Sequence, residues 1–352
     1  MSRRPKSADF DAEEAVPEPD RLDGFPHPRQ TETLFGQAAG EQQLADALAS
    51  GRVHHAWLLT GPEGIGKATL AYRFARAALA TAAEREAIAP GHLSVDPGSV
   101  AARQVRALSH PGLTVIRRPW NRETKRLSQV IPVDEVRRLK SFLQHSAGEG
   151  AYRIVIVDRA EEMNSAAANA LLKSLEEPPQ RTVFLLISSE PGRLLPTIHS
   201  RCRRLELKRL GEADLIAAVA AAQGGNASID KAPLVASLAD GSVRRALELL
   251  GGGAVDQHAK IVALLGQLPG LDFEAVHKLA ESAGAHGADA EFHSFFSLLS
   301  GVIARALRAS TTGEPSPPGE VALSAGFAQA APLAAWAELW EAIVREKAEV
   351  AA

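Results

Sequence analysis

The sequence predicts an α/β protein in which a parallel sheet, covered by helices, is followed by helical regions. Three observations support this. Short runs of branched apolar residues alternate with amphipathic segments between residues 54 and 188, as in a parallel sheet with helices on both faces. A glycine-rich loop joins one of these runs to an alanine-rich helical segment. Beyond Leu210 the pattern is helical, and no segment is a convincing strand.

The composition is that of an ordinary globular protein with two or three domains. The chain has 352 residues, 23% of them charged, and a formal net charge of −3, so the overall charge does not require a nucleic-acid partner. Its one cysteine, Cys202, excludes a disulfide framework and a cysteine-rich zinc site. Because residues 1–20 lack an apolar core and no apolar run is long enough to cross a bilayer, we expect a cytoplasmic protein.

The elements expected in the first part follow one another in strand–helix order. Residues 1–28 are charged and proline-rich, which predicts a mobile tail. After it the patterns predict a helix (31–48), a strand (54–60), a helix (68–83), an irregular insertion (90–109) and a strand (110–116). These are followed by a basic loop (117–126), a helix (133–145), a strand (154–157), a helix from Asn164 or Ser165 to Pro178, and a strand (182–188).

The second part is expected to be entirely helical. Short helices are predicted at 213–223, 232–239 and 243–250, followed by a boundary at Gly251-Gly252-Gly253. Longer amphipathic helices are predicted at 256–268, 273–283, 290–310 and 333–350, with a Pro/Gly/Ser loop at 312–319. Trp336 and Trp340 lie one helical turn apart, on a face that is either core or subunit interface.

The spacing of Gly61, Gly64, Gly66 and Lys67 predicts a phosphate-binding loop. Glycines allow successive backbone N–H groups to turn toward phosphate oxygens, and Lys67 would reach the terminal phosphates. The alternative is a tight turn with a surface lysine. A strand before the loop and a helix after it favour the phosphate loop.

Two positions depart from what a hydrolysing site needs. Ala68 stands where a serine or threonine hydroxyl would bind magnesium, and Thr69 is rotated by about 100° around the helix. Asp158 ends its strand at the place of a metal-associated aspartate, but Arg159 follows it, and a cation cannot accept a proton from attacking water. Glu161, a nearby carboxylate that could replace the missing base, is expected to point away from the nucleotide site. Together these departures predict a site that does not hydrolyse its nucleotide.

Two arginines are candidates for phosphate contact. Arg201 lies in a short polar turn beyond the last predicted strand, where its guanidinium would project outward; the alternative is a structural pair with a surface carboxylate. Arg244 begins a helix after Gly241-Ser242, and its alternative is an exposed helix residue.

Four motifs together resemble one family: the loop Gly61–Lys67, the strand ending in Asp158, the run ANALLKSLEEPP at 168–179, and Ser200-Arg201-Cys202. The chain resembles bacterial sliding-clamp-loader subunits of the AAA+ class over roughly residues 34–250. The missing hydroxyl and glutamate are similar to the delta-prime type of DNA polymerase III subunit, not to the ATP-hydrolysing gamma/tau type. The resemblance implies an AAA+ core at 29–209, a small helical lid at 210–252 and an all-α collar at 253–352.

The resemblance also implies roles for single residues. Arg201 matches the arginine finger that reaches the neighbouring subunit's ATP, and Arg244 matches the sensor arginine of the lid. Ser188 matches the residue that senses the terminal phosphate, with Ser189 as the fallback. The remaining positions of a degenerate nucleotide site would be Gly61, Gly64, Gly66, Lys67, Thr69 and Asp158.

Partners and cofactors follow from the same resemblance. The partners would be gamma/tau and delta subunits in a hetero-oligomeric ring, and through that ring the sliding clamp and primer-template DNA. The resemblance leaves open whether the chain binds ATP or ADP without hydrolysing it. The cysteine module that binds zinc in many relatives is missing from residues 84–110, so no zinc is expected. Any polymerase activity would belong to the holoenzyme. The alternatives are an active ATPase that uses Thr69 and Glu161, and a scaffold in which Arg201 is structural.

Overall fold

The chain forms two compact units, the first of which contains the sheet. The structure, a computed structural model, describes residues 17–144, 151–225, 232–251, 253–283, 289–313, 316–317 and 319–350. The first unit comprises Met1–Thr33, Ala38–Gly61 and Lys67–Leu207, and the second comprises Leu34–Gln37, Pro62–Gly66 and Lys208–Ala352. The glycine-rich loop is therefore shared. Its ends, Gly61 and Lys67, belong to the first unit, and its middle belongs to the second.

The sheet of the first unit has five parallel strands in the order β2-β5-β6-β1-β7. Their bounds are β1 (Ala56–Thr60), β2 (Leu113–Ile116), β5 (Arg153–Val157), β6 (Thr182–Ser188) and β7 (Arg203–Glu206). Thr60 of β1 pairs with Ser188 of β6, and Val157 of β5 pairs with Ile116 of β2, so the carboxyl ends of these strands share one edge. The predicted α/β architecture with a parallel sheet is confirmed, and so is the all-α character of the described C-terminal region.

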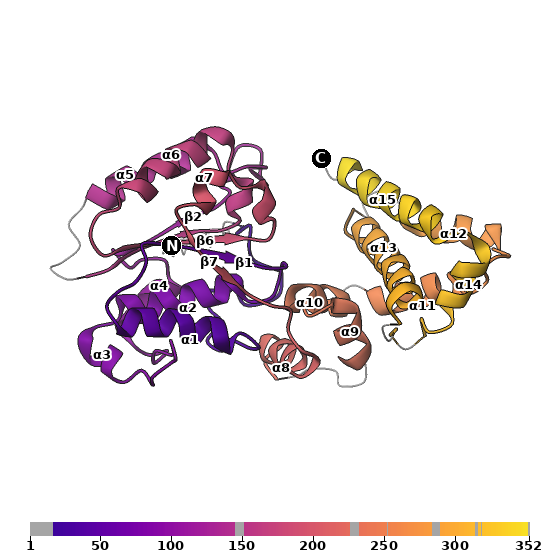
Figure 1. The fold of residues 1–352 in the computed structure, drawn as a ribbon, viewed down its shortest axis with the longest axis horizontal. Helices are drawn as coiled ribbons and strands as arrows, with labels where there is room; N and C mark the ends of the chain where they lie inside the picture. The colour runs from indigo at the N-terminus through magenta and orange to yellow at the C-terminus, as the bar shows by residue number, and fades with distance from the viewer. Residues whose placement is uncertain are drawn as a thin grey trace, which may run out of the picture. The chain divides into compact units, whose positions relative to one another are not determined.

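Helices cover both faces of this sheet (Figure 1). One face carries α1 (Ala38–Ala49), α2 (Lys67–Leu79) and α4 (Val100–Arg106), and the other carries α5 (Val133–Gln144) and α6 (Ser165–Glu176). Shorter elements complete the unit: α3 (Ala82–Glu86), η1 (Ala160–Glu162), η2 (Pro191–Arg193) and α7 (Pro196–His199). Asn164 caps α6, because its Oδ1 accepts a hydrogen bond from the Ala167 amide at 2.8 Å.

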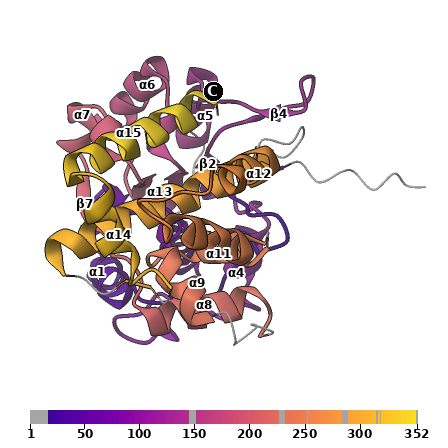
Figure 2. The same ribbon diagram turned by 90° about the vertical axis from the view of Figure 1, so that its right-hand side faces the viewer.

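Two strand features were not predicted from the sequence. Arg203 and Arg204 begin edge strand β7, and the Arg203 guanidinium lies 4.8 Å from the centre of the Trp57 ring. The predicted basic loop contains a hairpin of β3 (Trp120–Asn121) and β4 (Arg126–Leu127), which projects from the first unit (Figure 2). Both segments expose polar side chains, so hydrophobic periodicity does not reveal them.

The second unit is helical throughout its described part. Its helices are α8 (Glu212–Ala222), α9 (Ala232–Ala239), α10 (Val243–Gly251), α11 (Ala254–Leu265), α12 (Phe273–Ala283), α13 (Asp289–Thr312), α14 (Leu323–Ala330) and α15 (Leu333–Val350). Trp336 belongs to the core of this unit, since it is buried and its Nε1 donates to the Phe327 carbonyl at 2.9 Å. The division of this region into lid and collar remains a prediction. In the described part of the chain, no helix combines the length and apolar character that crossing a membrane requires.

The predicted mobile tail differs from the structure at residues 17–28. His27 is fully buried, and Glu18 and Asp20 form ion pairs with side chains of the sheet-containing unit. The expectation of a mobile tail is wrong for this stretch because its charged residues have specific partners. Residues 1–16 of the predicted tail lie outside the described residues.

Candidate functional site

The ends of the glycine-rich loop hold Lys67 in place at the edge of the sheet. Gly61 directly follows β1, and Lys67 begins α2. Lys67 is only 5% exposed, and its Nζ donates hydrogen bonds to the Gly61 carbonyl at 2.7 Å and to Ser189 Oγ at 2.9 Å. Positive φ angles at Gly61 (134°) and Gly66 (100°) give the loop its curl. The ammonium group therefore lies where a loop of this type brings its lysine to phosphate.

The middle of the loop packs against the start of α10. Gly64 has a φ of 76°, and the Val243 amide donates to its carbonyl at 2.9 Å. A Cβ atom on Gly64 would lie 2.7 Å from Arg244 Cβ and 3.0 Å from the Arg244 amide nitrogen, so only glycine fits. Buried Gln37 also holds this segment, since its Nε2 donates to the carbonyls of Ile65 at 3.1 Å and Lys208 at 2.7 Å.

Arg244, the predicted sensor arginine, lies beside the loop. Its Nε is 3.0 Å from Glu248 Oε1 and 3.6 Å from Glu63 Oε1, and Glu63 is part of the loop. With these two carboxylates beside it, the Arg244 side chain is about one-third exposed to solvent. The role of Arg244 as a sensor arginine stays a prediction.

Ser189, not Ser188, meets the loop lysine. Ser188 is fully buried at the end of β6, whereas Ser189 Oγ accepts the hydrogen bond from Lys67. The Ser189 amide in turn donates to Glu161 Oε1 at 3.0 Å. The expectation that Glu161 points elsewhere is wrong, because its carboxylate is bound beside the residue that contacts Lys67.

Asp158 lies at the end of β5, as predicted, but it is closed off from solvent. Its amide donates to the Ile116 carbonyl at 2.9 Å, and the residue is 6% exposed. Burial, followed by the charge of Asp20 and a hydrogen bond with its side chain, raises the pKa of Asp158 to about 8. Arg159 has a left-handed backbone (φ 51°), and its Nη1 lies 3.1 Å from Glu162 Oε1.

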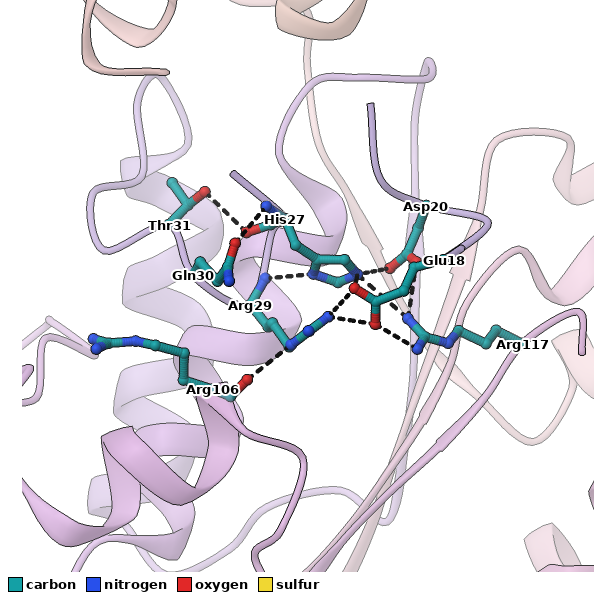
Figure 3. Close-up of polar contacts among 8 residues, drawn as sticks. All are labelled: Glu18, Asp20, His27, Arg29, Gln30, Thr31, Arg106 and Arg117. Atoms are coloured by element: carbon teal, nitrogen blue, oxygen red, sulfur yellow. Dashed lines mark hydrogen bonds and ion pairs between the residues drawn. The ribbon is translucent and has the colours of Figure 1, made fainter. Parts of the chain in front are cut away.

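Asp20, whose charge contributes to the raised pKa of Asp158, belongs to a cluster of ion pairs between residues 17–31 and Arg117 (Figure 3). Arg117 Nη1 lies 3.0 Å from Asp20 Oδ1, and Arg117 Nη2 lies 2.6 Å from Glu18 Oε1. His27 Nδ1 accepts a hydrogen bond from the Arg29 amide at 3.0 Å, and His27 Nε2 lies 2.7 Å from Asp20 Oδ2. Although burial opposes it, the hydrogen bond to His27 and the charges of His27 and Arg117 lower the pKa of Asp20 to about 2.

Sequence reasoning missed this cluster. Glu18 and Asp20 are separated from Arg117 by about a hundred residues, and no local pattern pairs them. One signal was present. His27 lies between two prolines, which stiffen a stretch that otherwise has the composition of a tail.

The residues at this edge of the sheet suit a nucleotide phosphate but not magnesium. The buried ammonium of Lys67 supplies a positive charge at the start of α2, which suits an anion such as phosphate. Magnesium requires ionised carboxylate or hydroxyl oxygens that leave room for its water ligands. Ala68 has no such oxygen, Thr69 lies further round the first turn of α2, and the raised pKa of the buried Asp158 carboxyl disfavours its ionised form. The described residues contain no cluster of three His, Cys, Asp or Glu side chains that would hold a metal ion.

Arg201 lies in the turn after α7 and is held by a carboxylate of the same unit. Its Nη2 is 2.5 Å from Glu176 Oε1 at the end of α6, and its Nη1 donates to the Thr197 carbonyl at 3.0 Å. The Arg201 side chain remains 32% exposed. The turn therefore presents a guanidinium at the surface, with one carboxylate as its partner.

Comparison with known proteins connects this arrangement to DNA polymerase III subunits. Residues 36–211 match the family described as DNA polymerase III, delta subunit. DNA polymerase III subunit delta' of Pseudomonas aeruginosa is 38% identical over 232 residues, which are 66% of this chain and 63% of that protein. Subunit gamma/tau of Mycobacterium tuberculosis is 30% identical over 283 residues, which are 76% of this chain and 46% of that protein. The chain thus spans between about half and two thirds of the length of these relatives.

Two solved structures from Thermotoga maritima also resemble the chain. A DNA polymerase III gamma subunit-related protein is 18% identical with a TM-score of 0.39, covering 87% of this chain and 99% of the other. The RuvB Holliday junction branch migration motor is 16% identical with a TM-score of 0.41, covering 91% of both chains. The family match spans half of the sequence and includes the phosphate loop, Asp158 and the Ser-Arg-Cys turn, so this chain belongs to the DNA polymerase III delta subunit family.

Proposed function

We propose that this chain is a delta-prime-type clamp-loader subunit that binds nucleotide without hydrolysing it and supplies Arg201 to the ATP site of a neighbouring subunit. Its partners would be gamma/tau and delta subunits in a hetero-oligomeric ring that places the sliding clamp on primer-template DNA. One observation carries the proposal: the glycine-rich loop ends in the buried ammonium of Lys67, while neither Ala68 nor the buried Asp158 offers the accessible oxygen that magnesium needs.

Binding without turnover follows from the charges at the loop. Lys67 and the loop amides would neutralise phosphate oxygens, which suffices for affinity. Hydrolysis would also require a metal ion and a group that accepts a proton from water. Arg159 follows Asp158 as a cation and cannot accept that proton. Such a subunit contributes to the ring by completing the site of its neighbour.

The contact between Arg201 and Glu176 suits a guanidinium that changes partner. Both side chains are part-exposed, and surface pairs of this kind stabilise by about 0–1 kcal/mol. A phosphate offers a bidentate, charge-assisted contact of greater strength. Arg201 would therefore leave Glu176 for a neighbour's γ-phosphate at little cost. In the free chain, Glu176 limits the conformations of the arginine.

The proposal is tested by primer-template-stimulated ATP hydrolysis of the reconstituted loader with Arg201→Ala in this chain. We expect turnover at the one site served by Arg201 to fall by about a thousandfold or more, while the ring still assembles. Arg193→Ala is the matched control, because Arg193 is another exposed arginine paired with a nearby carboxylate, Glu190. Unchanged turnover in an intact Arg201→Ala ring would make Arg201 structural and the chain a scaffold.

The second candidate function is an ATP-hydrolysing subunit of the gamma/tau type. The position of Glu161 favours it, since this carboxylate is bound to Ser189 beside Lys67. An enzyme of this kind would hydrolyse ATP as an isolated chain with magnesium, and Glu161→Gln would abolish that activity. Our proposal predicts no turnover by the isolated chain, so this assay separates the two functions.

A further inference from the structure

Two arginines of the second unit converge on Gly301 of α13. A Cβ atom on Gly301 would lie 3.0 Å from Arg245 Nη2 and 3.1 Å from Arg305 Nη1. Arg245 belongs to α10 and Arg305 to α13, so two different helices of this unit supply the guanidinium groups. Because glycine has no side chain, the space beside its Cα lies open between the two cations.

Arg305 uses one side of its guanidinium for Glu320 and turns the other side toward Gly301. Its Nε donates to Glu320 Oε2 at 2.9 Å, and its Nη2 donates to Glu320 Oε1 at 2.6 Å. The third nitrogen, Nη1, takes no part in this bidentate pair and is the one that lies beside Gly301. The pair with Glu320 thus fixes the orientation of Arg305 and leaves Nη1 for another acceptor.

The Arg245 guanidinium is poorly satisfied by the described residues. It makes one hydrogen bond with them, from Nη2 to the Ser297 carbonyl, at the long distance of 3.5 Å. The residue is partly buried, and burial, followed by the charge of Arg305, lowers the pKa of Arg245. A cation that has lost part of its water in this way is stabilised by a counter-ion.

The carboxylates whose charges act on Arg245 are paired with other arginines. These carboxylates are Asp240 and Glu248. Asp240 forms an ion pair with Arg209, and Glu248 Oε1 lies 3.0 Å from Arg244 Nε. Among the residues that the structure describes, the positive charge of Arg245 therefore has no carboxylate of its own.

We propose that the gap at Gly301 is a binding site for a small oxyanion such as inorganic phosphate, held between Arg245 Nη2 and Arg305 Nη1. Guanidinium groups offer N–H donors in a plane, and phosphate presents several acceptor oxygens, so one ion can bind both groups. The ion would supply the missing counter-charge and would connect α10 with α13. The site contains no residue of the phosphate loop and is separate from the proposed nucleotide site.

Thermal unfolding of the full chain in a series of phosphate concentrations, at constant pH and ionic strength, tests the site. All chains carry Lys67→Met, so that phosphate bound at the glycine-rich loop does not contribute. We expect the unfolding midpoint to rise with phosphate, because a ligand of the folded chain stabilises it. Arg245→Gln should weaken the apparent affinity for phosphate by about tenfold or more, since a hydrogen bond to a charged group is lost.

Arg308→Gln is the matched control, because it removes the same charge from an exposed position of α13. It should keep the phosphate dependence, and any general stabilisation by phosphate should be equal in all variants. Gly301→Ala is a second test that keeps every arginine. Its Cβ would narrow the gap, so we expect it to lose the phosphate dependence although alanine favours the helix.

Two results would overturn the site. One is an unfolding midpoint that does not respond to phosphate in the Lys67→Met chain. The other is a response of Arg245→Gln or Gly301→Ala that equals the response of Arg308→Gln. If Arg245→Gln does not unfold cooperatively, Gly301→Ala decides. Because the measurement uses neither ATP nor Lys67, its failure would leave the proposed nucleotide binding and the role of Arg201 unaffected.

Discussion

At the scale of single residues, Cys202 reports on the turn that carries Arg201. It is the one cysteine of the chain, and burial raises the pKa of its thiol to about 12. Only the thiolate reacts with iodoacetamide. Relative to the ordinary pKa of 9.0, we expect alkylation at pH 8 to be slower by about a thousandfold in the native chain than in guanidinium chloride. Timed alkylation followed by mass spectrometry measures both rates.

Equal rates in the native and denatured chains would show that the thiol is accessible and that the turn opens readily. Since there is a single thiol, no second cysteine has to be removed for the comparison. The denatured chain itself is the control for the intrinsic reactivity of the local sequence.

The residues that sequence reasoning placed well are those whose role is encoded locally. Gly61, Gly66 and Lys67 follow one spacing rule, and the structure holds them in the predicted strand–loop–helix context. Whether Ser188 or Ser189 contacts Lys67 depends on which of the two side chains faces the loop at the end of β6. The sequence does not decide this, because both residues are serines, and in the structure the contact is made by Ser189. The contact of Asp20 with Arg117 could not be found this way, because Arg117 lies about a hundred residues away in the chain.

At the scale of elements, the close approach of α10 to the phosphate loop makes Gly64 a sensitive position. An alanine there would require a positive φ, costing about 1 kcal/mol, and would press its Cβ against Arg244. We expect Gly64→Ala to lower the free energy of unfolding by about 2–4 kcal/mol, since overpacking adds its own cost. Urea denaturation measures the loss.

The matched control for this variant is Gly224→Ala. Gly224 has a similar φ of 69° in the same unit, and a Cβ there would meet no atom within 4 Å. We expect Gly224→Ala to lower the free energy of unfolding only by the cost of the positive φ, about 1 kcal/mol. If the two variants lost the same stability, the contact between the loop and α10 would carry no packing energy.

Elements were predicted well where their side chains are buried. The apolar runs of β1, β5 and β6 mark central strands, and all three were found from the sequence. β7 was missed because it is an edge strand of the sequence Arg-Arg-Leu-Glu, in which only Leu205 is buried. Its place is set by pairing with β1, and pairing partners are not visible in a short polar segment.

At the scale of the whole molecule, each unit is held together by its own buried ion-pair cluster. The ion pairs of Glu18 and Asp20 with Arg117 belong to the first unit, and in the second unit side chains of α11 and α13 meet at Glu320. Arg305 contacts both Glu320 oxygens, at 2.9 and 2.6 Å, and His258 Nε2 lies 2.7 Å from Oε1. Glu320 is 1% exposed, so the Arg305 guanidinium and the His258 ring are its polar neighbours. The sequence did not predict either cluster, since each joins segments that are far apart along the chain.

The Glu320 cluster makes the stability of the second unit depend on pH. Although burial raises it, hydrogen bonds from His258 and Arg305 bring the pKa of Glu320 below its ordinary value of 4.5. A lowered pKa stabilises the folded unit above pH 4.5, and this stabilisation is lost as the pH falls through the folded-state value. We expect Glu320→Gln to destabilise the unit by about 3 kcal/mol at neutral pH, because Arg305 and His258 lose a buried partner.

Calorimetry across the acid range measures this effect, since the variant should also lose the part of the acid dependence that Glu320 supplies. Glu274→Gln is the control: Glu274 pairs with Lys278 on an exposed helix face, and its removal should change stability by no more than about 0.5 kcal/mol. If Glu320→Gln kept the wild-type acid dependence, the carboxylate that titrates would lie elsewhere, and the meeting of α11 and α13 would depend on apolar packing alone. A reduced slope in Glu320→Gln, with Glu274→Gln unchanged, would assign the acid sensitivity of the second unit to this one buried carboxylate.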